Sequence, residues 1–160
     1  MNYAAFKEAV FAQAKALGLT EYELYYSAGE ESSVETYKTE VKGFATSKSQ
    51  GACFRCLVDG KIGYASTSLL SQEEAERLVE HAMDNAATLE TTEEQFIYAG
   101  DEHYAEITPK PVHKPNTEEL TNFALRLQKD LYAGDSRIVD GTQTQAAYES
   151  REVAIDNSYG

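Results

Sequence analysis

Three stretches of the chain carry hydrophobic residues at the spacing of three and four that is typical of an amphipathic helix. The first lies between Asn2, which can serve as an N-cap, and Gly18, which is placed to end a helix. The chain is therefore predicted to open with a helix. The residues on its predicted buried face are Phe6, Ala9, Val10, Gln13 and Leu17.

Caps and hydrophobic faces together predict the second and third helices. Ser71 with Glu74, and Asn116 with Glu119, have the spacing of a capping box. Gly134 is placed to end the third helix. The predicted buried faces are formed by Ala75, Leu78, Val79, Ala82, Met83, Ala86 and Ala87 in the second helix, and by Leu120, Phe123, Ala124, Leu127 and Leu131 in the third.

Between the first two helices the hydrophobic period changes to two, which indicates strands. Residues 22–27 alternate between the two faces, and the polar residues 28–31 are predicted to end this strand. Residues 32–37 and 41–49 contain the Val, Thr, Tyr and Phe that favour strands, with a polar turn at residues 38–40. This region therefore holds three predicted strands.

Residues 50–67 predict a β-hairpin. Asp59 and Gly60 are a favoured pair for a type I′ turn. A two-residue loop at this point sets the register of the two strands, and apolar groups then lie on both faces, so we expect the hairpin in the centre of the sheet. The predicted facing pairs are Leu57 with Ile62, Arg55 with Tyr64, and Cys56 with Gly63.

After the second helix the chain becomes polar and irregular. Residues 89–115 contain all three prolines of the chain and are predicted to form a loop or linker. Residues 138–148 and 153–155 predict two late strands, separated by a polar turn at 149–151. The predicted fold class is therefore α+β, with about three helices packed against a predominantly antiparallel or mixed sheet of about five early and two late strands.

The last residues, Asp156 to Gly160, have the composition of a turn that leads into a further strand. A natural terminus seldom follows such a turn. We therefore interpret residues 1–160 as the N-terminal domain of a longer protein, ending at or near a domain boundary.

The chain is strongly acidic, because 27 Asp and Glu residues against 14 Lys and Arg give a formal net charge of −13. This charge would repel a phosphate backbone, which argues against nucleic acid as a partner. No apolar run approaches the roughly 18 residues of a membrane span, and the first residues lack the pattern of a signal peptide. We expect a cytoplasmic protein whose two cysteines stay reduced.

Cys53 and Cys56 have the spacing of redox dithiols and of half a zinc site. Residues three apart in a strand point to opposite faces, however, and neither a second cysteine pair nor a nearby histidine completes a zinc site. We therefore interpret both cysteines as packing residues. The alternative, thiol or metal chemistry, predicts a lowered thiol pKa.

No other group of residues predicts catalysis. His81 is interpreted as part of a solvated helix face, and the Asp101-Glu102-His103 segment as an exposed loop that could alternatively bind a cation. The hydroxyls of residues 66–68 suit a strand end and a helix cap. The tyrosines within residues 22–37 either pack between strands or line a contact surface. We assign no catalytic, cofactor-binding or metal-binding residue in the chain.

The order of these features resembles the N-terminal part of the TldD/PmbA proteins, also called modulators of DNA gyrase. The resemblance covers nearly the whole chain. The run from Gly63 to Ser68 is more similar to the PmbA (TldE) branch than to the TldD branch. The residues that carry the resemblance are Gly51, Arg55 and Gly60, the run Gly63-Tyr64-Ala65-Ser66-Thr67-Ser68 before Leu70-Ser71, and the final Asn157-Ser158-x-Gly160.

The resemblance implies a cytoplasmic zinc-dependent peptidase in which TldD-type and PmbA-type subunits pair and act on peptides or unfolded segments. Its zinc would be bound by a His-Glu-x-x-x-His motif of a later, C-terminal domain, and this motif does not occur in the 160 residues. The expected partners are that C-terminal domain, a homologous subunit and a peptide, with neither nucleic acid nor membrane. We expect an inactive scaffold and interaction domain without a cofactor, or alternatively a non-enzymatic partner-binding module of a PmbA-type subunit.

Overall fold

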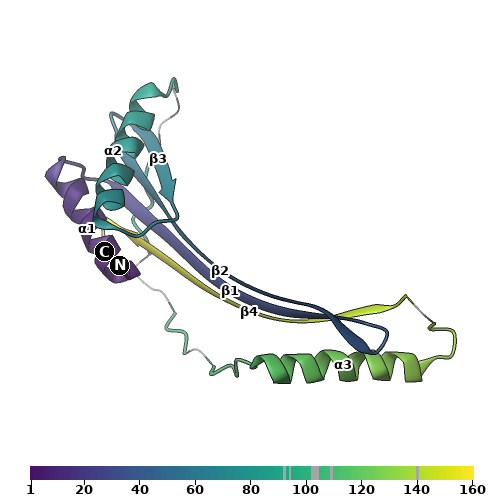
Figure 1. Cartoon of the computed structure of the whole chain (residues 1–160). Coiled ribbons are helices and arrows are strands. Elements are labelled where there is room, and N and C mark those ends of the chain that lie inside the picture. Colours follow the sequence, from purple (N-terminus) through teal and green to yellow (C-terminus); the bar gives the residue numbers. More distant parts are fainter. Residues whose placement is uncertain (92, 94, 102–104, 109, 140) are drawn as a thin grey trace. The chain divides into compact units, whose positions relative to one another are not determined.

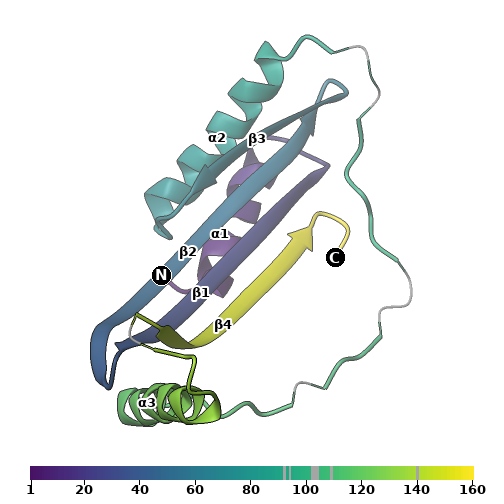
Figure 2. The same cartoon turned by 90° about the vertical axis from the view of Figure 1, so that its right-hand side faces the viewer.

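A computed structural model describes residues 1–91, 93, 95–101, 105–108, 110–139 and 141–160. Their elements, in chain order, are α1 (Tyr3–Ala16), β1 (Tyr22–Tyr37), β2 (Glu40–Val58), β3 (Lys61–Thr67), α2 (Gln72–Thr88), α3 (Thr117–Gly134) and β4 (Gln143–Asn157). The described residues thus form three helices and one four-stranded sheet (Figure 1; Figure 2), which confirms the α+β class. No helix in the described part of the chain is both long and apolar enough to cross a membrane.

Two helices begin with the predicted caps. Asn2 Oδ1 accepts a hydrogen bond from the Ala5 N–H at 2.9 Å, and Gly18 follows α1 with a φ of 79°. A positive φ costs glycine little, which is why it suits the position after a helix. At the start of α3, Asn116 and Glu119 form the complete capping box.

At α2 only half of the predicted capping box forms. Ser71 Oγ accepts a hydrogen bond from the Glu74 N–H at 3.2 Å. The Glu74 carboxylate instead accepts hydrogen bonds from Arg77 and from Thr67, which lies at the end of β3. The carboxylate therefore ties the helix to the preceding strand rather than to its own cap.

The β2–β3 hairpin has the predicted register but not the predicted place in the sheet. Arg55 faces Tyr64, Cys56 faces Gly63, and the strands are antiparallel. The strand order is β3-β2-β1-β4, so β3 is an edge strand. The expectation of a central hairpin holds for β2, which lies inside the sheet, and is wrong for β3. Apolar residues on two faces indicate that layers cover those faces, and carry no information about a lateral neighbour.

The strands are longer and fewer than predicted. β1 continues through residues 28–31, and β4 continues through the polar residues 149–151. Among described non-glycine residues, only Lys38 and Asp59 have the positive φ that a two-residue hairpin turn requires. Polar residues continue a strand where its faces meet solvent, and those at the predicted breaks are half-buried or exposed. The predicted seven strands are therefore corrected to four within the described residues.

The chain divides into two compact units. Unit 1 comprises residues 1–28, 49–106 and 152–160, and unit 2 comprises residues 29–48 and 107–151. In unit 1, α1 and α2 pack on the sheet around one hydrophobic cluster. Its buried members are Phe6, Val10, Ala14, Tyr22, Leu24, Tyr26, Ala52, Phe54, Cys56, Leu70, Ala75, Leu78, Val79 and Ala82.

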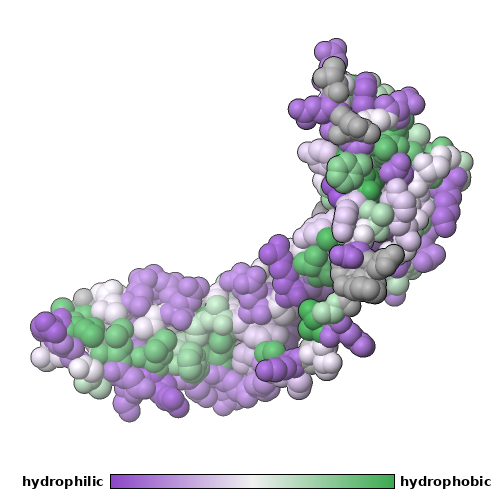
Figure 3. All heavy atoms as spheres, turned by 180° about the vertical axis from the view of Figure 1, so that it is seen from behind, coloured by the Kyte–Doolittle hydropathy of each residue, from purple (hydrophilic) through white to green (hydrophobic). Residues whose placement is uncertain are grey.

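Unit 2 has a smaller core, in which only one row of α3 is buried. Gln128 lies in that row, and its Nε2 donates a hydrogen bond to the Thr142 carbonyl at 3.0 Å. Phe123 and Leu127, which were predicted to be buried, are 56% and 41% exposed. Hydrophobic side chains accordingly gather along α3 at the surface (Figure 3). The buried cluster consists of Val34, Leu120, Ala124 and Ala146.

Candidate interaction site at the edge strand

The two cysteines lie on opposite faces of β2, as predicted. Cys56 is buried in the core of unit 1, and burial raises its thiol pKa to about 11. Cys53 is half-buried, and burial raises its pKa as well, despite the opposing effect of the Arg55 charge. Redox and metal chemistry need the thiolate, which a raised pKa disfavours. The structure therefore supports packing roles for both cysteines.

The described histidines, His81 and His113, belong to different units. His81 is exposed on α2, in agreement with a solvated face. His113 Nε2 lies 3.1 Å from Glu119 Oε2 at the start of α3. Glu102 and His103 lie outside the described residues, so the interpretation of the Asp101-Glu102-His103 segment stays a prediction.

Strand β3 and helix α2 approach each other closely at Gly63. A Cβ added to Gly63 would lie 1.9 Å from the Ala82 carbonyl oxygen and 2.5 Å from the Ala86 nitrogen. No side chain fits at these distances, so a glycine is required at this position. The contact packs the last turns of α2 directly against one face of β3.

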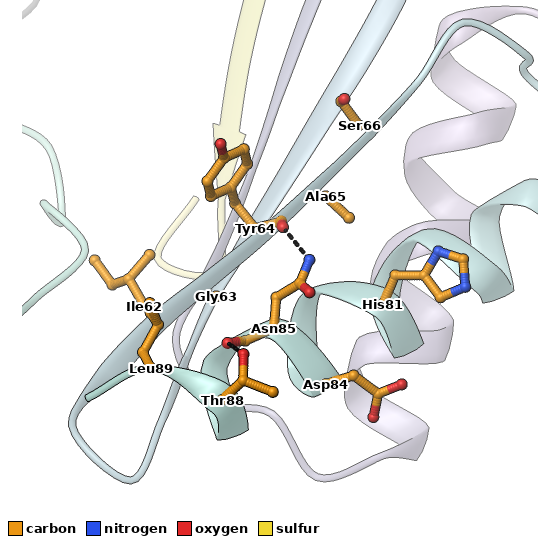
Figure 4. Close-up of a pocket in the computed structure, with 10 residues that line it drawn as sticks. All are labelled: Ile62, Gly63, Tyr64, Ala65, Ser66, His81, Asp84, Asn85, Thr88 and Leu89. Carbon is orange, nitrogen blue, oxygen red and sulfur yellow. Dashed lines mark hydrogen bonds between the residues drawn. The ribbon is translucent and has the colours of Figure 1, made fainter. Parts of the chain in front are cut away.

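A groove of about 710 Å³ lies between β3 and α2 (Figure 4). Residues 62–66 of β3 form one wall, and residues of α2 and its C-cap form the other. Figure 4 shows Asn85 reaching from the helix to the Tyr64 backbone, while the Tyr64 ring points away from the helix. Of the described residues that line the groove, Asp84 is the one carboxylate and none is Lys or Arg.

Two side-chain amides cap the open edge of β3. Asn85 Nδ2 donates a hydrogen bond to the Tyr64 carbonyl at 2.9 Å, and the Ile62 N–H donates one to Gln95 Oε1 at 2.6 Å. A neighbouring strand would offer a backbone N–H and C=O at these two places. The amides therefore stand where the backbone of a fifth strand would pair.

Further backbone groups lie on the same open edge. In an antiparallel strand, the N–H and C=O of one residue point to one side, and the next residue points to the other. Because Ile62 and Tyr64 bond to groups outside β2, Ser66 also directs its backbone away from β2. No described residue engages the Tyr64 N–H or the Ser66 backbone from that side.

The face of unit 1 opposite the helices carries a mixture of apolar and charged residues. There an Arg55 nitrogen lies 2.9 Å from Glu23 Oε1, and no described residue bonds the buried Arg55 Nε. Tyr25 and Tyr64 are 37% and 64% exposed, whereas the neighbouring tyrosines of β1, at 22 and 26, are buried in the core. Strand packing thus accounts for two of the predicted tyrosines, and Tyr25 remains available for contact.

Sequence reasoning missed the residues that shape the edge of β3. Asn85 lies on the polar side of a predicted helix and Gln95 in a predicted loop, and neither belongs to a motif. A signal existed for the close approach, since Ala82 and Ala86 share the helix face predicted to be buried and Gly63 lies in the hairpin. The caps, by contrast, depend on the position of β3 at the sheet edge, which the pattern does not give.

Residues 22–86 match the family described as PmbA/TldA metallopeptidase domain 1. This region contains β1, the β2–β3 hairpin and most of α2, and therefore all of the edge strand. Within these residues the chain is similar to PmbA/TldD domain 1. The resemblance seen in the sequence is thereby confirmed. No curated protein matches the sequence of the chain.

Solved structures share the fold of this domain at low sequence identity. A proposed modulator of a DNA gyrase from Thermotoga maritima has a TM-score of 0.83 at 21% sequence identity. The match covers 99% of this chain and 36% of that protein. TldE from Thermococcus kodakarensis has a TM-score of 0.77 at 16% sequence identity, and the match covers 98% of this chain and 35% of TldE. A proposed modulator of DNA gyrase from Bacteroides thetaiotaomicron has a TM-score of 0.72 at 17% sequence identity, and the match covers 98% of this chain and 37% of that protein. The chain thus spans about a third of the length of these proteins.

The described residues of the chain do not fit the metal centre that the word metallopeptidase implies. A zinc site needs three or four nitrogen, sulfur or carboxylate ligands that converge. The sequence contains no His-Glu-x-x-x-His motif. In the described part of the chain, no three His, Cys, Asp or Glu side chains are placed to hold a metal ion.

Proposed function

We propose that the chain is the N-terminal scaffold and interaction domain of a PmbA/TldD-type metallopeptidase subunit that acts on peptides or unfolded segments. The match of residues 22–86 to domain 1 of the family carries the proposal. The 36% coverage of the Thermotoga maritima protein supports it, because most of that protein lies outside the shared region. In this proposal the catalytic groups and the zinc belong to a C-terminal domain, and the subunit works in the cytoplasm beside a homologous subunit.

A second candidate is a non-enzymatic module that binds a partner for a PmbA-type subunit. Exposed apolar side chains support it in each unit. In unit 1, Tyr64 and Ile155 are 64% and 61% exposed, and in unit 2 Phe123 is 56% exposed. Groups of such side chains on a domain surface often mark a binding surface.

One set of measurements on the purified 160-residue chain tests the first proposal. The zinc content, the cleavage of an unfolded reporter peptide and the mass of a mixture with a TldD-type subunit are measured. We expect less than stoichiometric zinc, no turnover, and a complex with the subunit in light scattering. Stoichiometric zinc or robust turnover would show that the chain supplies catalytic groups, and would contradict the proposal.

The second candidate makes a different prediction for the same mixture. Phe123→Asp replaces an exposed apolar contact without touching the buried row of α3, and Glu118→Lys serves as a charge-changing control in the first turn of the same helix. Weaker complex formation by Phe123→Asp alone would support partner binding through this surface. Equal binding by both variants and the unchanged chain would exclude the α3 surface as the contact.

A further inference from the structure

We propose that the outer edge of β3 is a binding site for an extended polypeptide segment that carries Lys or Arg, which adds to the sheet as a fifth strand. The edge site consists of the open backbone groups of Ile62, Tyr64 and Ser66 together with the adjoining groove. The inference deepens the proposed interaction role and rests on it, since it names the surface that binds and the chemistry of what is bound.

The backbone geometry carries the first step. Ile62 and Tyr64 present an N–H and a C=O to the open side, each already engaged by an amide of the chain itself. The caps show that both backbone groups are oriented and accessible to a partner at hydrogen-bonding distance. A fifth strand would meet the same two groups and would also reach the Tyr64 N–H and the backbone of Ser66.

An incoming strand can displace the two caps at little cost in free energy. Each cap is a single hydrogen bond with a neutral side-chain amide, which donates at Tyr64 and accepts at Ile62, and an incoming strand replaces it with a backbone amide of the same chemistry. The exchange at Ile62 and Tyr64 is therefore close to neutral. The additional bonds to Tyr64 and Ser66 favour the bound state. Without a bound strand, the same caps would protect the edge from unwanted pairing.

The charge of the groove favours a segment that carries Lys or Arg. Asp84 lines the groove, and none of its described lining residues is Lys or Arg. The groove also borders the C-terminal end of α2, where the helix dipole adds partial negative charge. The chain as a whole has a formal charge of −13. A basic segment is therefore attracted, whereas a second copy of this acidic chain would be repelled.

Fluorescence anisotropy with labelled decapeptides tests the site on the 160-residue chain. The probe alternates Lys and Val, one matched peptide has Glu in place of Lys, and another has the Lys–Val sequence with alternate backbone nitrogens methylated along one edge. We expect saturable binding of the Lys–Val peptide and at least tenfold weaker binding of both matched peptides. Equal affinity for the methylated peptide would overturn strand addition, and equal affinity for the Glu peptide would overturn the charge selection.

Variants of the protein distinguish peptide binding at the edge site from non-specific binding elsewhere on the surface. Asn85→Ala removes a cap that competes with the strand, and we expect a fewfold gain in affinity for the Lys–Val peptide. Thr88→Ala is the matched control, because Thr88 lines the groove but its hydroxyl bonds to the Asn85 carbonyl rather than to β3. Unchanged or weaker binding by Asn85→Ala would contradict displacement of the cap.

Ser66→Pro removes an open-side N–H without removing a bond to β2, and we expect at least tenfold weaker binding. Circular dichroism checks that this variant folds, and the methylated peptide tests the same bond without altering the protein. A folded Ser66→Pro chain with unchanged affinity would overturn the proposal, as would a β3-linked dimer that takes up no peptide. A complex with a TldD-type subunit but no peptide binding would refute the edge site alone and leave the proposed function standing.

Discussion

Replacing Gly63 with alanine should strongly destabilise unit 1. The added Cβ would lie 1.9 Å from the Ala82 carbonyl oxygen and 2.7 Å from the Ala86 Cβ, whereas ordinary contacts begin at 3.4 Å. The obstruction includes helix backbone, which cannot rotate away like a side chain, so α2 must shift by about 1.5 Å at this point. Overpacking usually costs about 1–3 kcal/mol, and we expect about 3 kcal/mol or more here because the whole helix must move off the sheet.

Urea denaturation followed by circular dichroism measures this loss. With an m-value of about 2 kcal/mol/M, a loss of about 3 kcal/mol lowers the midpoint by about 1.5 M. Gly51→Ala is the matched control, because a Cβ there meets its nearest atom, the Thr67 carbonyl oxygen, at 3.4 Å. We expect the control to change stability by less than about 1 kcal/mol. Equal midpoints for the two variants would refute the close approach of β3 and α2.

Three further predictions concern other parts of the fold. Asn116→Ala removes the capping box of α3 and should lower the free energy of unfolding by about 1 kcal/mol in urea denaturation, whereas an unchanged value would refute the cap. Burial raises the pKa of Asp156, but hydrogen bonds from a tyrosine and from Lys7 on α1 lower it overall. This stabilisation is complete above the ordinary Asp pKa of about 3.9 and is lost as the pH falls through the folded value, so Lys7→Ala should destabilise the protein more at pH 7 than at pH 2. An equal loss of stability at the two pH values would contradict a contribution from the ionised Asp156 carboxylate. Cys56 should react with a thiol reagent only after unfolding, because it is buried and its pKa is raised to about 11, and rapid labelling in the folded state would contradict its packing role.

The elements that the sequence predicts well are those with a local signal. The Asn116–Glu119 capping box and the Asp59-Gly60 turn each involve neighbours in the chain, and the structure has both. The length of β1 was underestimated, because polar residues near Gly29 imitate a turn while their backbone stays extended. The polar character of these residues indicates that their side chains meet solvent. It does not indicate whether their backbone groups bond to a neighbouring strand.

The edge site depends on contacts that are distant in the chain. Asn85 and Ile62 receive their roles from the packing of α2 on β3 and from the absence of a fifth strand beside β3 in the described residues. Hydrophobic periodicity identifies a buried face but not the lateral order of strands, so the edge position was not predictable. Gly63 was recognised as part of the hairpin, yet the contact that requires a glycine is visible only when the helix is in place.

Residue-resolved hydrogen exchange of the 160-residue chain, with and without the Lys–Val peptide, tests the proposed strand addition most directly. A fifth strand at β3 predicts slower exchange of the Tyr64 and Ser66 amides on peptide binding, and unchanged exchange of the Gly63 amide, which already faces β2. Peptide binding that leaves the exchange of Tyr64 and Ser66 unchanged would contradict the edge site.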